Sequence, residues 1–338
     1  MKQKLTYLCA LAALLTATAC THDDAPGGTT EGTASAAFHI TTRADGTTGI
    51  GQGQHAWLYL AERLPELPNG EQLYCDQCYD VSNGSYLIEG LTAQWYKLAF
   101  ICLPQGVKAP TVDSDHEFND YVIDYSPVLT NQDTQDALNA NKDLAIYRQI
   151  IDRWLLPDER LTENVTLTRI TGQFILDMGI LKDQFPGRVS QITVSLGQVP
   201  QKVYLRDNGN GEILYPEDES TPKSQSYQFT ISPETWEGND HFRVYLDLLP
   251  FELKNATVTV KHLAPVVGQT EMQDVELPFP LVSGHHSGTG EKENISVKPN
   301  TRTTVYFRGM EPEEFEVRYA GFDNQSIDVD GDEWNGWN

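Results

Sequence analysis

Short runs in which apolar and polar residues alternate dominate this sequence. The run from Trp95 to Leu103 is long and apolar, and Pro104 stops it. Alternation with a period of two places successive side chains on opposite faces of a β-strand, and proline ends a strand because it lacks an N–H donor. Many short strands must each bury one face against a second sheet. The sequence therefore predicts an all-β fold of two tandem Greek-key β-sandwich domains.

The same pattern recurs on both sides of the polar segment Pro157–Asn164, after which a fresh series of strands begins. We therefore expect an N-terminal sandwich over residues 36–160 and a C-terminal sandwich over residues 161–338. Asp133–Asp143 is the best place for a helical turn, because its residues favour helix over strand. The other expected strands are Phe38–Thr42, Ala56–Ala61, Tyr86–Ile88, Tyr121–Tyr125, Val165–Ile170, Phe174–Met178, Val189–Leu196, Val203–Leu205, Tyr227–Ile231, Phe242–Leu248, Ala256–Leu263, Asn294–Val297, Thr303–Arg308 and Phe315–Tyr319.

The first twenty residues have the three-part layout of a secretory signal. The basic start Met1–Lys4 is followed by the apolar stretch Leu5–Ala19, which ends in small residues. This stretch is shorter than the roughly 20 residues that a membrane-spanning helix needs. Cys20 follows directly and resembles the cysteine of a bacterial lipobox, whose thiol is diacylated and becomes the mature N-terminus. We expect a signal peptide at residues 1–19 and a lipid on Cys20; the alternative is an ordinary signal peptide with an incidental cysteine.

Residues 20–35 are rich in Gly, Thr, Ser and Ala, a composition that predicts a flexible tether. Asp23 and Asp24 resemble the signal that sends Bacteroidetes lipoproteins to the outer cell surface. The whole chain has 24 Lys and Arg against 48 Asp and Glu, a formal net charge of −24. Phosphate groups repel such a chain, so we expect no nucleic-acid partner. The prediction is a lipid-anchored, surface-exposed protein of the outer membrane.

Three further cysteines remain in the mature chain: Cys75, Cys78 and Cys102. Cys75 and Cys78 have the spacing of a redox or zinc half-site, but no second cysteine pair and no βαβ pattern accompany them. In an oxidising compartment we expect one disulfide from Cys102 to either Cys75 or Cys78, with one thiol left over. The sequence does not choose between the two pairings.

Four segments, in order along the chain, resemble one known family. Leu91–Phe100 is similar to a first-domain strand with a Leu…Tyr-x-Leu pattern, and Lys142–Arg148 to an Asp-Leu-Tyr-Arg stretch near the end of that domain. Val165–Ile170 is similar to a Val-x-Leu-x-Arg strand that opens the second domain, and Ile295–Gly309 to a closing Pro-Asn…strand…Gly pair. The family is that of the fimbrillin-type (type V) pilus subunits of Bacteroidales, specifically their lipoprotein anchor or accessory subunits.

This resemblance implies a cell-surface fimbrial subunit with two transthyretin-like sandwich domains. In this family an extended segment of one subunit completes the open sheet of its neighbour, so the expected partners are other fimbrial subunits joined by donor-strand exchange. In polymerising subunits, proteolysis after a basic residue removes the first strand and frees a groove. The matching cut here lies near Arg43. Because that cut also severs the lipid at Cys20, we expect an anchor to avoid it.

The C-terminal segment Ile327–Trp337 alternates apolar and acidic residues and contains two tryptophans. A donated strand with Ile327 and Val329 on one face, followed by Trp334 and Trp337 as plugs, fits this pattern. One alternative is the last strand of the second domain, packed against its own core. A calcium loop is another, because aspartates stand at every other position, but the Gly and the terminal Glu of such a loop are misplaced.

Motifs for catalysis are absent from the sequence: it has no Gly-x-Ser-x-Gly elbow, no phosphate loop and no dinucleotide fingerprint. His285 and His286 are adjacent, so their side chains diverge, and we interpret them as part of a solvated loop. We therefore expect a structural fimbrial subunit with no enzymatic activity, cofactor or metal site. The alternative is a fimbrial tip adhesin or a surface lipoprotein that binds glycans or host proteins.

Overall fold

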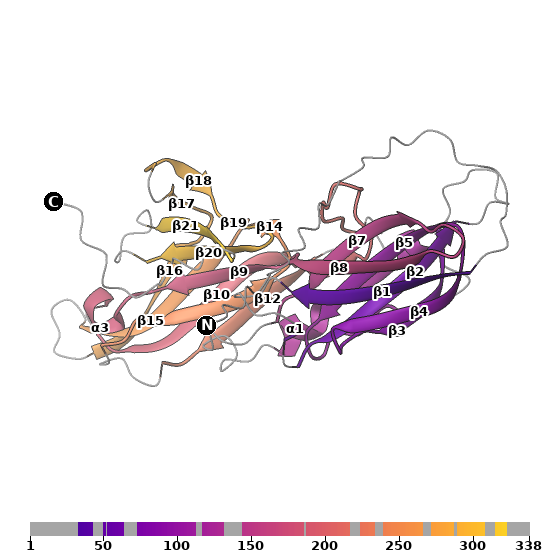
Figure 1. Cartoon of the computed structure of the whole chain (residues 1–338). Coiled ribbons are helices and arrows are strands. Elements are labelled where there is room, and N and C mark those ends of the chain that lie inside the picture. Colours follow the sequence, from indigo (N-terminus) through magenta and orange to yellow (C-terminus); the bar gives the residue numbers. More distant parts are fainter. Residues whose placement is uncertain are drawn as a thin grey trace, which may run out of the picture.

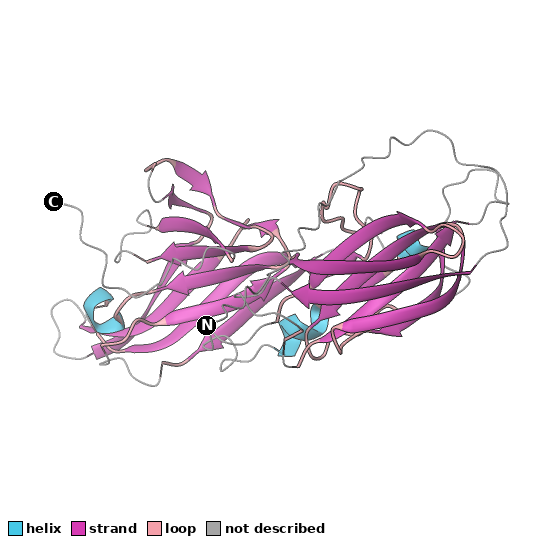
Figure 2. Cartoon of the chain, in the orientation of Figure 1, coloured by secondary structure: helices cyan, strands magenta, loops and turns pink. Residues whose placement is uncertain are grey.

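The computed structural model describes residues 33–42, 50–51, 53–63, 73–112, 117–131, 144–185, 187–216, 224–233, 239–265, 272–286, 289–307 and 315–322. Strands make up nearly all of its regular structure (Figures 1 and 2), which confirms the all-β prediction. Of the helices in these residues, none is long and apolar enough to cross a membrane. The helical segments described are η1 (Phe118–Asp120), α1 (Ser126–Asn131) and α3 (Leu181–Gln184).

The N-terminal half forms a seven-stranded sheet in the order β3-β2-β5-β7-β8-β1-β4. Only two residue pairs join β7 to β8, at Tyr147–Arg169 and Arg148–Thr168. Strands on both sides of this narrow seam turn alternate side chains onto one shared core, so they form two packed layers. Their bounds are β1 (Thr33–Thr42), β2 (His55–Arg63), β3 (Leu73–Asp80), β4 (Ser85–Thr92), β5 (Trp95–Leu103), β7 (Tyr147–Trp154) and β8 (Arg160–Arg169).

The C-terminal half pairs a four-stranded sheet, β12-β10-β15-β16, with a six-stranded sheet, β13-β9-β20-β21-β17-β18. Apolar side chains of both sheets enter one core, where the rings of Phe279 and Phe307 meet edge to face with centroids 4.8 Å apart. Such ring pairs stabilise a core beyond the area they bury. The bounds are β9 (Gly172–Asp177), β10 (Val189–Pro200), β12 (Ser224–Ile231), β13 (Arg243–Leu248), β15 (Thr257–Pro265), β16 (Met272–Pro280), β17 (Ser283–His286), β18 (Lys292–Asn294), β20 (Thr301–Tyr306) and β21 (Glu316–Gly321), with a separate pair of β14 (Phe251–Glu252) and β19 (Ser296–Val297).

The two halves share buried surface at a joint. β6 (Val122–Asp124) of the first half pairs antiparallel with β11 (Lys202–Tyr204) of the second. The buried hydroxyl of Tyr125 donates to the carbonyl oxygens of Leu144, at 2.8 Å, and Asp247, at 3.1 Å. One apolar cluster runs from the outer face of β2, β3 and β5 through this joint into the C-terminal core. The two halves are therefore joined by apolar packing and by hydrogen bonds.

Most predicted strands are present, and two differences concern the first half. β1 begins at Thr33, inside the stretch predicted as tether, because Ala34 and Ala36 are small enough to pack into the core beside its neighbours. β8, which was expected to open the second domain, pairs with β1 in the first. The division at residue 160 stays a prediction, and Asp133–Asp143 lies outside the described residues.

His285 and His286 lie in strand β17, so the prediction of a solvated loop is wrong. Their backbone pairs with β21 as a parallel strand. The exposed His285 places Nδ1 3.1 Å from the carbonyl oxygen of Gly290, whereas the ring of His286 stacks on Tyr319 at a centroid distance of 5.9 Å. The two side chains diverge, as adjacent residues of a strand must.

Cys75, Cys78 and Cys102 form no disulfide with one another, so the predicted bond to Cys102 is wrong. Cys102 faces the core between the two layers, whereas Cys75 and Cys78 face the apolar cluster on the other side of the sheet. β3 has a bulge at the residue between Cys75 and Gln77, which has no partner on β2. This bulge turns the side chains of Cys75 and Cys78 to the same face of the sheet. Because a disulfide requires Cβ atoms about 4 Å apart, the sheet itself keeps Cys102 from both.

Candidate assembly site at strand β1

β1 occupies the middle of a three-stranded layer, between β4 and β8. It pairs antiparallel with β4 from Thr33 to His39 and parallel with β8 from Ser35 to Thr42. Both edges of its backbone therefore carry ladder hydrogen bonds. Without β1, the facing edges of β4 and β8 would be left unpaired on either side of an open slot.

Alternate side chains of β1 fill the core of the N-terminal half. The ring of Phe38 meets Phe100 of β5 edge to face, with centroids 5.1 Å apart, whereas His39 points outward and is exposed. The strand thus supplies both a backbone and a row of apolar side chains, the two things that strand addition requires. The almost fully buried residues of this row are Ala34, Ala36, Phe38, Ile40 and Thr42.

Two of the predicted site residues flank this slot in the sequence. β1 ends at Thr42, one residue before Arg43, and begins thirteen residues after Cys20. Arg43 and Cys20 themselves lie outside the described residues. A cut after Arg43 would leave β1 covalently joined only to the segment that carries Cys20. Retention of the tether would then depend on strand pairing and core packing alone.

The described chain ends at the joint between the halves. β21 is an inner strand, antiparallel to β20 and parallel to β17. Phe322 follows it and is buried. The guanidinium carbons of Arg169 and Arg302 lie 3.7 Å and 4.6 Å from the centroid of its ring. The predicted donor residues lie beyond this point and outside the described residues: Ile327, Val329, Trp334 and Trp337.

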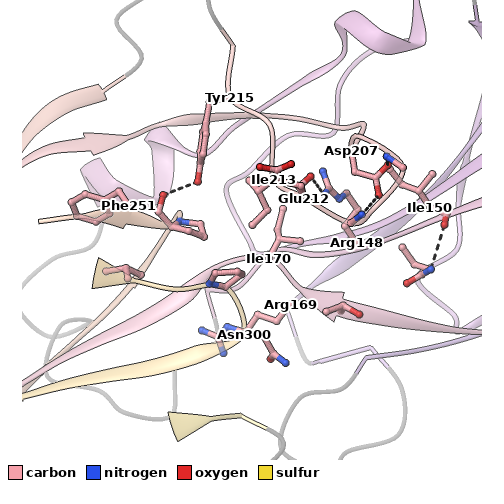
Figure 3. A pocket seen from close by; sticks show the side chains of 17 residues that line it. Arg148, Ile150, Arg169, Ile170, Asp207, Glu212, Ile213, Tyr215, Phe251 and Asn300 are labelled. Carbon is pink, nitrogen blue, oxygen red and sulfur yellow. Dashed lines mark hydrogen bonds between the residues drawn. The ribbon is translucent and has the colours of Figure 1, made fainter. Parts of the chain in front are cut away.

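A cleft of about 720 Å³ opens at the joint, lined in part by β7, β8 and the loop at residues 207–215 (Figure 3). Arg148 on its wall is 4% exposed, and burial lowers the pKa of its guanidinium. Nη1 donates to the carbonyl oxygens of Tyr204, Leu205 and Arg206 at 2.8–3.3 Å, and Nη2 donates to that of Glu212 at 3.2 Å. Arg148 therefore fixes the loop of the second half to a strand of the first.

The other polar groups of the cleft are used in the same way. Arg169 forms a buried ion pair with Asp247 of β13, and Asp247 also accepts a hydrogen bond from the N–H of Leu144 at 3.2 Å. Tyr215 donates its hydroxyl to the carbonyl oxygen of Pro250 at 2.6 Å, and burial raises its pKa. These groups bind one another and the backbone, so they stabilise the joint.

The described residues hold no group of three His, Cys, Asp or Glu side chains placed to bind a metal ion. The sequence analysis named the segments that contain Arg148, Arg169 and Asp247 but missed what these charged residues do. A signal was present for Asp247, which stands in the otherwise apolar run from Val244 to Leu248. Buried Arg and Asp are rare unless they are paired, so such positions predict partners across the core.

No protein-family model matches this sequence, and no curated protein matches it either. Solved structures do. A proposed cell adhesion protein from Parabacteroides distasonis is 14% identical, with a TM-score of 0.46 over 86% of this chain and 97% of that chain. A proposed cell adhesion protein from Bacteroides eggerthii is 13% identical, with a TM-score of 0.46 over 87% and 97%. The fimbrial anchor protein Mfa2 from Porphyromonas gingivalis is 8% identical, with a TM-score of 0.42 over 86% and 98%.

Proposed function

We propose that this chain is a structural fimbrial subunit of the anchoring or accessory kind, held to the outer membrane by a lipid on Cys20. The observation that carries the proposal is the place of β1. This strand begins thirteen residues after Cys20 and is hydrogen-bonded along both edges inside a folded core. The sequence resemblance to lipoprotein subunits of type V pili supports the same role.

The position of β1 suits a protein that carries load. A force applied through the lipid acts first on β1, which must slide out from between β4 and β8 before the fold gives way. Shearing a strand with hydrogen bonds on both edges and Phe38 and Ile40 in the core breaks many contacts together. An anchor gains from this arrangement only while the chain stays intact after β1. We therefore propose that the mature protein is not cleaved at Arg43.

Assembly with a neighbouring subunit is proposed to use the C-terminal segment. The chain reaches Phe322 at the joint, and the segment that follows contains the alternating pattern of Ile327 and Val329 and the two tryptophans. A strand inserted into the open sheet of another subunit would satisfy the backbone groups and fill the apolar groove of that sheet. The proposed action is binding, with no chemical reaction, and a broad screen for glycoside or peptide hydrolysis tests that part.

The main experiment is co-purification of the intact lipoprotein with fimbriae from cells. The comparison is between the wild type, a form truncated before Ile327, and the double substitution Ile327→Asp, Val329→Asp. We expect both changes to release fibres from the cells, because they remove or charge the apolar face. The matched control is Asp328→Asn, Asp330→Asn, which changes the other face of the same segment. Fibres that stay cell-attached without the segment would show that donation from the C-terminus is wrong.

The competing role is that of a tip adhesin or a surface lipoprotein that captures glycans or host proteins. The two roles differ in what happens at the N-terminus. An anchor retains the lipid and an uncut bond after Arg43 in the mature fibre. Mass spectrometry of the fibre-associated chain decides between them: an unlipidated chain that begins after Arg43 contradicts the anchor and favours a position away from the membrane.

A further inference from the structure

We infer that the end of the N-terminal half from which the tether emerges rests on the lipid surface, through an exposed apolar patch formed by Trp154 and Leu156 beside the partly buried ring of Trp95. This inference rests on the proposed lipidation of Cys20. It adds a second membrane contact, made by the folded domain itself, that fixes how the protein stands on the membrane.

The strand register places the patch and the start of β1 at the same end of the molecule. β7 starts at the joint, where Arg148 binds the second half, and ends at Trp154. The loop after it returns as β8, and in this loop the carbonyl oxygen of Glu159 accepts a hydrogen bond from the N–H of Ser35 at 2.8 Å. Figure 1 shows β1 starting at this far end and running toward the second half. The tether therefore joins the fold beside the β7–β8 loop.

Exposed large apolar side chains gather at this end. Trp154 is 44% exposed and Leu156 56%; within the described residues two other large apolar side chains have comparable exposure, Leu87 of β4 at 56% and Met272 of β16 at 51%. Leu87 lies opposite Ala37 on the outer face of the β8-β1-β4 layer, whereas Trp154 lies across from Trp95 on the outer face of the β5-β7 layer, so Leu87 is not part of the patch. Solvent-exposed apolar residues scattered singly need no explanation, but a cluster indicates a contact surface.

The chemistry of the patch suits the interface of a bilayer. Trp154 lies directly across from Trp95, and the amine of Lys97 lies 5.9 Å from the centroid of the Trp95 ring. Tryptophan prefers the boundary between headgroups and acyl chains, and lysine near it extends its amine to the headgroups. Acidic residues stand beside the patch, among them Asp152, which pairs with Lys97 at 3.3 Å. The contact is therefore apolar in origin, and it gains nothing from anionic lipid.

The length of the tether keeps this end of the domain within reach of the bilayer. Thr33 comes thirteen residues after Cys20, and this stretch spans at most about 45 Å when fully extended. A lipid fixed at Cys20 therefore keeps the start of β1 within that distance of the bilayer. This confinement gives the patch a high effective concentration of lipid, so a modest apolar contact is enough to form.

The test uses the full-length lipoprotein, reconstituted into phosphatidylethanolamine–phosphatidylcholine vesicles with or without bromine in the acyl chains. Bromine quenches tryptophan emission only at short range. We expect the wild type to be quenched and Trp154→Phe to lose about half or more of that quenching, because Trp154 is the exposed ring of the patch. The control is Trp57→Phe, a partly buried ring whose cross-strand neighbour on β5 is Ile101, and it should leave the quenching as in the wild type.

A second pair of variants keeps the fluorescent ring. Leu156→Asp places a charge in the patch and should reduce the quenching of Trp154 severalfold, whereas Met272→Asp, at nearly equal exposure in the other half, should not. Equal quenching in the wild type, Trp154→Phe and Leu156→Asp overturns the inference, as does protection of Trp154 by a second protein in the absence of lipid. Vesicle flotation separates this result from the proposed function: a chain that does not float lacks the lipid, and the anchor role fails first.

Discussion

β1 and β16 have similar lengths and similar alternation, yet the fold uses them in opposite ways. β1 lies between two strands and buries five alternate side chains, whereas β16 forms an edge and, within its nine residues, buries only Phe279 fully. β16 also ends with Pro278 and Pro280, which have no N–H to offer an incoming strand. The comparison predicts that a slot with a core beneath it holds an added strand better than a free edge does.

The largest effect is expected from Phe38→Ala. Phe38 is 1% exposed and packs against Phe100, so its loss should lower the free energy of unfolding by about 3–5 kcal/mol, measured by chemical denaturation. His39→Ala on the same strand is the control and should change stability by less than about 0.5 kcal/mol, because its side chain is exposed. A loss below about 1 kcal/mol for Phe38→Ala would mean that β1 is not the core strand described here.

The contrast between the two strands also explains what the sequence could predict. β5 has the predicted bounds, because a buried strand between two neighbours reads as an uninterrupted apolar run. β16 was not predicted, since its acidic residues and prolines resemble a loop, and only pairing with β15 makes it a strand. β3 was missed because its bulge between Cys75 and Gln77 breaks the period of two.

The candidate site at β1 also has one part that the sequence predicts and another that it does not. The apolar half of β1, from Phe38 onward, was predicted from its alternation. Its start was not, because Thr33-Ala34-Ser35-Ala36 has the composition of a tether and becomes a strand only when β4 and β8 supply hydrogen bonds. The joint depends on partners such as Arg169 and Asp247, which stand far apart in the sequence. No local pattern can pair residues of this kind.

β3 combines features of the two strands: it is an edge strand like β16, but some of its side chains are buried like those of β1. Burial raises the pKa of Cys78 on this strand to about 11. A hydrogen bond from Tyr59 acts in the opposite direction and lowers this pKa, but its contribution is the smaller one. The reactive thiolate forms only as the pH rises through the pKa, so at pH 8 its fraction should be about a hundredfold lower than for an ordinary thiol.

Alkylation by iodoacetamide, followed by mass spectrometry across pH 7–10.5, measures this. We expect Cys78 to react slowly at neutral pH and progressively faster toward the top of that range, with Cys78→Ser as the blank. Cys102, which is buried between the layers, should stay unreacted throughout while the protein is folded. Rapid labelling of Cys78 at pH 7 would show that the β3 edge opens freely, and it would remove the distinction between this edge and the β1 slot.

A smaller effect is expected from Ala36→Leu. Ala36 is 1% exposed, where β1 enters its slot, so a larger side chain has no room and should lower the free energy of unfolding by about 1–3 kcal/mol. Ala37→Leu, whose side chain points to the outer face of the same strand, is the matched control and should stay within about 0.5 kcal/mol. Thermal and denaturant unfolding of both variants measure the difference. Equal effects at the two positions would contradict the inward and outward register of β1.

The smallest effect on stability, and the most direct test of the comparison, comes from Pro278→Thr, Pro280→Thr on β16. Both prolines are exposed, so the monomer should change by less than about 0.5 kcal/mol. Threonine restores two N–H groups and favours strand, which leaves the β16 edge open to pairing with another chain. We expect self-association that increases with protein concentration, measured by sedimentation velocity against wild type and against Met272→Ala, which alters the same strand without adding an N–H. A variant that stays monomeric at every concentration would show that the prolines are not what protects this edge, and the contrast between β1 and β16 would then rest on core burial alone.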